Sequence, residues 1–209
     1  MKIYYAPAGT NNIRTKIYLN EKGLDIPLQP VDIMKYEHKQ EPFLSKHPLG
    51  RLPVMELDDG TIITESMAIC RYLEEVNPEP PLFGTTPLEK ANIEMWSRRI
   101  ELELQIYFSA ILRNTQPFFA KSVYQVPEYV DACHKTVQDR FVWLNDIMGD
   151  TEYLAGDTFS VADITGVSAF LMIRQIKVDV PETLTNLHAW LDRVKSRDSV
   201  QEFIRKKQP

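Results

Sequence analysis

A proline-rich stretch divides this 209-residue chain into two parts with different patterns. Residues 77–87 read NPEPPLFGTTP, and their four prolines and one glycine cannot continue a helix. Short β-rich runs alternate with helical patterns before this stretch, whereas no strand is predicted after it. We therefore predict an α/β domain over residues 1–80, a linker over residues 77–87 and an all-helical domain over residues 88–209.

The first part has the pattern of a small mixed sheet covered by helices. Strands are predicted at 2–5, 28–33, 54–57 and 61–64, and helices at 12–22, 42–46 and 65–76. The first strand–helix–strand unit implies a parallel pair with a right-handed crossover. Asp58, Asp59 and Gly60 form a strong turn signal, so the last two strands should form an antiparallel hairpin. The sequence therefore predicts four strands in one mixed sheet.

The second part repeats apolar residues every three or four positions, which predicts helices at 88–114, 127–148 and 160–174, and one or two helices over 184–204. Ser160 and Asp163 form a variant of the capping box, and Phe159 and Ile164 flank it as a hydrophobic staple. The helix that they open is apolar on most sides, which is typical of the centre of a helical bundle.

Composition excludes several functional classes. The net charge of −5 argues against nucleic acid or an anionic membrane as the main partner. No apolar run approaches the length of a membrane span. Cys70 and Cys133 lie far apart and form neither a metal motif nor a redox pair, so we expect no metal and a cytoplasmic setting.

Two residues at the predicted start of the helix 65–76 suggest a ligand. A helix amino terminus attracts a carboxylate, Ser66 adds a hydroxyl donor, and Glu65 can pair with an ammonium group. A carboxylate and an ammonium on one carbon are the head group of an amino acid. The alternative is that both residues only cap the helix, which is what such residues usually do.

The run from Glu37 to Pro53, EHKQEPFLSKHPLGRLP, with Glu65 and Ser66 after it, resembles the cytosolic glutathione transferases. The likeness is greatest to the plant phi class and to related bacterial enzymes, and it covers the whole chain. It implies a thioredoxin-like N-terminal domain with a cis bond before Pro53, an all-α helical-bundle C-terminal domain and glutathione as co-substrate. It also implies a homodimer built largely by the helices that start near Glu65 and Leu88, with Arg71 in the contact.

Glutathione contacts follow from the same resemblance. Glu65 and Ser66 would bind the γ-glutamyl head group, and the backbone of Leu52 beside Pro53 would pair with the cysteinyl part. The glycyl carboxylate would lie near the basic residues His38, Lys39 and Arg51, where an arginine can bind it with two hydrogen bonds. Taken without the resemblance, residues 37–40 are more typical of a solvated polar loop.

The catalytic loop departs from the family pattern, because Gly9 stands where serine-type members carry serine. Thr10 supplies the adjacent hydroxyl, and Asn11 stands where beta-class members carry cysteine. Tyr5 matches the tyrosine-type spacing, although a tyrosine in a strand is more often a core residue. Thr10 and Asn11 are therefore the catalytic candidates, since either can donate a hydrogen bond to the glutathione sulfur.

The expected function is conjugation of glutathione to small hydrophobic electrophiles. The alternatives are glutathione-dependent isomerisation, peroxide reduction or dehalogenation, and a glutathione-binding protein with little turnover. Candidates for the second-substrate pocket lie on the first helix of the second domain: Tyr107, Phe108, Ile111 and Arg113.

Overall fold

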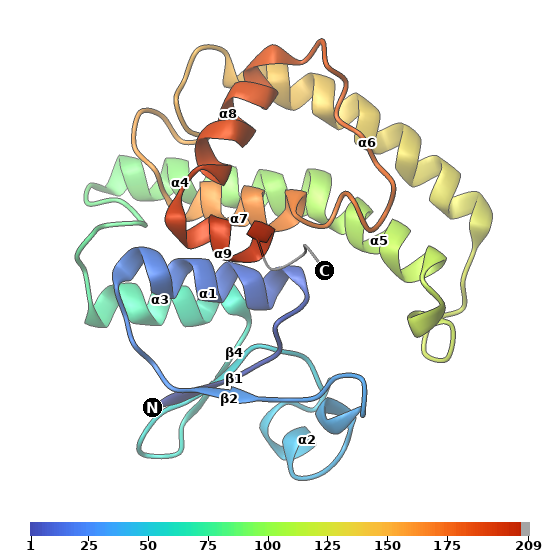
Figure 1. Cartoon of the computed structure of the whole chain (residues 1–209). Coiled ribbons are helices and arrows are strands. Elements are labelled where there is room, and N and C mark those ends of the chain that lie inside the picture. The colour runs from blue at the N-terminus through green and yellow to red at the C-terminus, as the bar shows by residue number, and fades with distance from the viewer. Residues whose placement is uncertain (206–209) are drawn as a thin grey trace. The chain divides into compact units, whose positions relative to one another are not determined.

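The computed structural model describes residues 1–205 and divides into two compact units at Leu82 and Phe83 (Figure 1). The side chain of Arg205 lies outside the described part. Within residues 1–205, no helix combines the length and apolar character needed to cross a bilayer. The domain limits 1–80 and 88–209, with the linker 77–87, stay a prediction.

Unit 1 contains the predicted four-stranded mixed sheet. Its strands are β1 (Lys2–Tyr5), β2 (Leu28–Pro30), β3 (Val54–Glu56) and β4 (Ile62–Thr64), in the order β2-β1-β3-β4. β1 is parallel to β2 and antiparallel to β3, and β3 is antiparallel to β4. β2 ends earlier than predicted because the Asp32 side chain accepts hydrogen bonds from the backbone of Met34 and Lys35, which turns the chain.

Helices cover both faces of this sheet. Figure 1 shows α1 (Thr10–Lys22) and α3 (Ser66–Val76) side by side over one face and α2 (Phe43–Lys46) on the opposite face. A 3₁₀ turn, η1 (Glu37–Lys39), precedes α2. The side of the sheet that faces α2 has a small core of Val31, Phe43 and Val54. The predicted cis bond at Leu52–Pro53 is confirmed.

A row of polar side chains, which we call the polar seam, joins α1 to α3. Its members are Arg14, Tyr18 and Lys22 on α1 and Ser66 and Glu74 on α3. Arg14 Nη1 donates to Ser66 Oγ over 2.9 Å. The Tyr18 hydroxyl and Lys22 Nζ both donate to Glu74 Oε2, over 2.7 and 2.9 Å. Burial and the Glu74 contact raise the pKa of Tyr18, so it remains a neutral donor.

Unit 2 is helical, and its described part contains no strand, as predicted. The predicted helix 88–114 is one continuous run of α4 (Pro87–Ile100), a π-helical segment η2 (Glu101–Gln105) and α5 (Ile106–Thr115). The 3₁₀ turn η3 (Pro117–Phe119) and α6 (Pro127–Met148) follow. The remaining helices are α7 (Val161–Phe170), α8 (Thr185–Lys195) and α9 (Asp198–Arg205). α7 ends before the predicted Arg174 because Met172 and Ile173 donate to carbonyls three residues back, which tightens the chain into turns.

The capping box at the start of α7 is present and does more than cap. Asp163 is completely buried and accepts four hydrogen bonds: from the backbone and hydroxyl of Ser160, from the backbone of Leu154 and from the Trp190 indole. Trp190 lies on α8, so this one carboxyl joins the loop before α7 to two helices.

Candidate functional site

The sheet topology brings the candidate glutathione contacts to one end of unit 1. Tyr4 near the end of β1 pairs with Val54 at the start of β3, and Val54 pairs with Thr64 at the end of β4. β2 runs parallel to β1, so its carboxyl end lies at this end of the sheet as well. The segments that leave or enter the sheet here carry Thr10 and Asn11, His38 and Lys39, Leu52 and Pro53, and Glu65 and Ser66.

The start of α3 is not capped by its own side chains. Glu65 is the N-cap residue, and no side chain caps the helix. Glu65 is exposed with φ 69°, a left-handed conformation that costs a non-glycine residue about 1–3 kcal/mol and is concentrated at functional sites. Both candidate side chains therefore remain available for other partners.

Ser66, the first residue of α3, is only 2% exposed. Its oxygen accepts the hydrogen bond from Arg14, which leaves the hydroxyl proton to donate elsewhere. Arg14 is equally buried and was not predicted as a functional residue. The sequence signal that could have identified Arg14 is its position: it is a charged residue on the buried face of α1, four positions from both Thr10 and Tyr18.

Asn12 shapes the loop between β1 and α1. Its amide Nδ2 donates to the Ala8 carbonyl over 2.9 Å, and its Oδ1 accepts from the backbone N–H of Ala6. Gly9, the N-cap residue, has φ 89°, a conformation that favours glycine. Asn12 is a second residue that the sequence reasoning missed, and its role is to hold the loop that presents Thr10.

Thr10 stands out within this loop. It begins α1, is 8% exposed, and its hydroxyl has no hydrogen-bond partner among the described residues. Buried hydroxyls nearly always have a partner. Asn11 is half-buried, and its carbonyl accepts from the Thr15 hydroxyl. The unused hydroxyl lies one helical turn before Arg14 on the same face of α1, and Arg14 contacts Ser66, so the catalytic candidate and the proposed head-group site are neighbours.

The basic candidates cluster around Gly50. A Cβ atom on Gly50, which has φ 54°, would lie 2.2 Å from the His38 carbonyl oxygen, so only glycine allows the two segments to touch. Lys39 Nζ donates to the Leu49 carbonyl over 2.6 Å. The exposed Arg51 follows directly. This packing brings His38, Lys39 and Arg51 together, as the predicted glycyl site requires.

The surroundings of the His38 imidazole disfavour its charged form. Burial and the nearby Lys39 ammonium lower its pKa. Its Nδ1 is buried and has no hydrogen-bond partner among residues 1–205. His38 can therefore act as a neutral hydrogen-bond donor or acceptor beside two permanent cations.

The four candidates for a second-substrate pocket lie on α5, but in different surroundings. Phe108 and Ile111 are completely buried, and the Phe108 ring contacts the rings of Phe141 and Phe170. Tyr107 is half-buried and Arg113 is exposed. The pocket stays a prediction, for which Tyr107 and Arg113 are the more accessible members.

No group of three or more histidine, cysteine or acidic side chains within the described residues is arranged to hold a metal ion. Both cysteines are free thiols buried in the interior. The candidate site offers hydrogen-bond donors, cations and the amino ends of α1 and α3.

Comparisons with known proteins match both units to one family. The family model for the glutathione S-transferase N-terminal domain matches residues 12–76, and the model for the C-terminal domain matches residues 96–198. Glutathione S-transferase 2 of Saccharomyces cerevisiae is 36% identical over 208 residues, covering 98% of this chain and 89% of that protein. Glutathione S-transferase F9 of Arabidopsis thaliana is 29% identical, covering 97% of this chain and 95% of its own.

Among solved structures, the crystal structure of Gtt2 from Saccharomyces cerevisiae superposes with a TM-score of 0.90 at 35% identity. The match covers 97% of this chain and all of that one (100%). The sheet of unit 1 is thus the thioredoxin-like domain, and unit 2 is the helical domain of that fold. This chain belongs to the glutathione S-transferase family and is an enzyme of that family.

Proposed function

We propose that the enzyme joins the glutathione thiolate to small hydrophobic electrophiles, with glutathione bound at the end of the unit 1 sheet. The observation that carries the proposal is the buried Ser66 hydroxyl at the uncapped start of α3, held by the buried Arg14. A hydroxyl in this position can donate to a carboxylate that also benefits from the helix amino terminus. Glu65 beside it would bind the ammonium group of the same γ-glutamyl head.

The cysteinyl and glycyl parts of glutathione would lie along the same end of the sheet. The backbone of Leu52, next to cis Pro53, would pair with the cysteinyl part. The glycyl carboxylate would lie near His38, Lys39 and Arg51. Two of these residues carry positive charge, and Arg51 is exposed, so its contribution is screened by solvent.

Activation of the thiol is assigned to the start of α1. Gly9 has no side chain, so the donor to sulfur would be the Thr10 hydroxyl, the Asn11 amide or a backbone N–H. Thr10 is favoured because its hydroxyl is the buried group without a partner. A donor near sulfur stabilises the thiolate, which is the nucleophile, and so lowers the pKa of the thiol.

The decisive experiment pairs calorimetry of glutathione binding with turnover of a chromogenic aryl halide. Binding with turnover supports the proposal. Turnover only with a peroxide, a haloalkane or an isomerisable substrate would assign another glutathione-dependent reaction to the same site. Binding without turnover on any of these would favour a glutathione-binding protein, the alternative that the missing serine at Gly9 keeps open.

A homodimer is the second part of the proposal. Leu88, Met95, Leu102 and Ile106 lie along one face of the run from α4 to α5, and their exposed fractions are 80%, 40%, 50% and 52%. Aligned apolar residues of this size are typical of a surface that another protein covers. We assign this face to a second copy of the chain, with Arg71 and α3 contributing as the family resemblance suggests.

Light scattering at micromolar concentration tests the dimer. The double variant Leu88→Glu/Leu102→Glu should shift the mass from dimer to monomer. Tyr124→Glu is the matched control, because Tyr124 is 91% exposed but lies off the α4–α5 run. A wild-type monomer, or equal effects of both variants, would exclude this face as the contact.

We also propose a cytoplasmic location, because both cysteines are free thiols rather than a disulfide. Fractionation of cells that express the protein tests this location.

A further inference from the structure

α2 lies in the chain between the basic residues that would bind the glycyl carboxylate of glutathione. It contains only Phe43–Lys46, with His38 and Lys39 before it and Arg51 after it. Contacts within this segment maintain its shape: Gly50 packs against the His38 backbone, and Lys39 donates to the Leu49 carbonyl. These contacts do not fix the segment to the sheet.

An apolar contact supplies one attachment of α2 to the sheet. Phe43 is buried against Val31 and Val54. Its ring meets the Tyr4 ring edge to face, with centroids 5.9 Å apart. Tyr4 belongs to β1, so this contact joins α2 to a central strand of the sheet.

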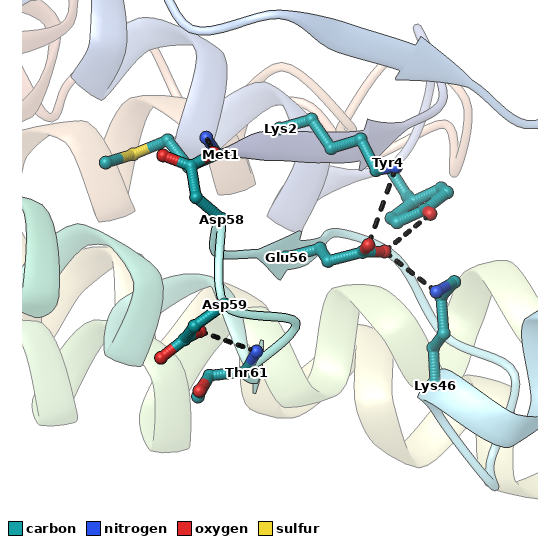
Figure 2. Close-up of polar contacts among 8 residues, drawn as sticks. All are labelled: Met1, Lys2, Tyr4, Lys46, Glu56, Asp58, Asp59 and Thr61. Atoms are coloured by element: carbon teal, nitrogen blue, oxygen red, sulfur yellow. Dashed lines mark hydrogen bonds and ion pairs between the residues drawn. The ribbon is translucent and has the colours of Figure 1, made fainter.

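A polar contact supplies a second attachment, which Figure 2 shows. Lys46 Nζ on α2 lies 2.8 Å from Glu56 Oε2 on β3, and the Tyr4 hydroxyl donates to the same oxygen over 2.7 Å. The Lys46 ammonium also lies 5.3 Å from the centre of the Tyr4 ring. Groups from α2 and β1 therefore converge on one carboxylate of β3, and the side chains of Lys46 and Glu56 are only 24% and 20% exposed.

Lys2 makes a similar contact with the same carboxylate from within the sheet. Its Nζ lies 3.5 Å from Glu56 Oε1 and 5.5 Å from the Tyr4 ring centre. Because Lys2 is on β1, its pairing with Glu56 joins two strands of the same sheet and does not hold α2. The hydrogen bonds from Lys46 and Tyr4 lower the pKa of Glu56 to about 2, so the carboxylate is charged at any physiological pH.

We propose that Lys46, Glu56 and Tyr4 form a latch that positions residues 37–52 for glutathione. These three side chains are positioning residues rather than ligand contacts. Through α2, the latch sets where His38, Lys39 and Arg51 stand relative to Glu65 and Ser66, which bind the other end of the tripeptide in the function proposed above. The latch thus determines the distance between the two ends of the site.

The test compares Lys46→Met with Lys2→Met. Each removes one ammonium group that pairs with Glu56 and keeps an aliphatic side chain near Tyr4, but only the first cuts the link to α2. We expect Lys46→Met to raise the KM for glutathione about three- to tenfold with kcat within about twofold. Lys2→Met should leave both constants near those of the wild type. Equal effects of the two variants would overturn the proposal.

Hydrogen exchange on the intact protein without glutathione provides a readout independent of catalysis. Lys46→Met should speed amide exchange across residues 37–50, whereas exchange in α1 and α3 should not change. The charge-conserving Lys46→Arg should restore slow exchange and the wild-type KM. Unchanged exchange in residues 37–50 of Lys46→Met would refute the latch even if KM rises.

These measurements also separate the latch from the proposed function. If the wild type binds no glutathione, the proposed function fails, and the exchange experiment alone decides whether the latch holds the segment. If the wild type binds and turns over glutathione but Lys46→Met matches Lys2→Met, the function stands and the latch is wrong.

Discussion

Replacing Ser66 by alanine would remove a hydroxyl with two roles. Its oxygen accepts from Arg14, and its proton is available for the γ-glutamyl carboxylate. A hydrogen bond to a charged group contributes about 1.5–3 kcal/mol. Because 1.4 kcal/mol corresponds to a tenfold change in affinity, Ser66→Ala should weaken glutathione binding roughly ten- to hundredfold.

Arg14→Met tests whether the arginine acts through that hydroxyl. The methionine fills part of the buried space but cannot donate to Ser66, so the hydroxyl loses its fixed orientation. Arg14 would not itself contact glutathione in this arrangement, and we expect Arg14→Met to cost about 0.5–2 kcal/mol of binding free energy. Once Ser66 is alanine, the arginine has no hydroxyl to orient, so the double variant should bind no worse than Ser66→Ala alone.

Calorimetric titration of glutathione into the four proteins of this double-mutant cycle is the assay. A thermal unfolding scan of each confirms that binding is compared among folded proteins. Additive losses in the double variant would refute the reasoning, because they would show that the two residues act separately. Glu65→Ala provides a reference: it should weaken binding to a similar extent as Ser66→Ala, and its loss should add to that of Arg14→Met.

The remaining predictions concern individual side chains. Thr10→Val removes a buried hydroxyl without a partner, so it should raise the unfolding free energy by up to about 1 kcal/mol. The same variant should shift the absorbance titration of the bound thiolate to higher pH. An unchanged titration would assign stabilisation of the thiolate to the backbone or to Asn11. Asp163→Ala leaves the Trp190 indole and the backbone N–H groups of Leu154 and Ser160 without their acceptor. Urea unfolding should therefore show that the free energy of unfolding falls by at least about 3 kcal/mol. A thiol reagent at pH 8 should not label Cys70 or Cys133 in the native protein, since both are buried and burial raises the pKa of Cys70 to about 12; both should react after unfolding, and rapid native labelling would contradict the burial. Because the folded pKa of Glu56 is about 2 against an ordinary 4.5, its stabilising contribution is present above pH 4.5 and lost as the pH falls toward 2. Glu56→Gln should therefore flatten the dependence of the unfolding free energy on pH between 4.5 and 2. The same dependence in the variant and the wild type would contradict this prediction.

Local sequence signals predicted the elements that local chemistry determines. β1 and α6 have their predicted limits, Lys2–Tyr5 and Pro127–Met148. The Ser160 capping box was readable because its two partners lie three residues apart. The family resemblance added the cis bond at Pro53, which spacing alone left open.

Features that depend on distant partners were not predicted. Arg14 meets Ser66 across 52 residues of sequence, so its role emerged only when α1 and α3 were seen together. The π-helical segment η2 interrupts an apolar repeat that continues on both sides of it, and the repeat gave no sign of the interruption. Phe108 and Ile111, two of the pocket candidates, are buried, and periodicity alone could not distinguish a core residue from one that lines a pocket.

The polar seam also limits how α1 and α3 can pack. Two apolar helices can slide past one another by a turn with modest loss, because leucine side chains interdigitate in several registers. Such a slip here would separate Lys22 from Glu74 and Arg14 from Ser66, and buried polar groups are costly when their hydrogen bonds are lost. The seam thus selects a single register for the two helices, and with it a single height for the start of α3 above the sheet. An all-leucine seam could stabilise the domain at least as well, but it would permit several registers and give up that unique alignment.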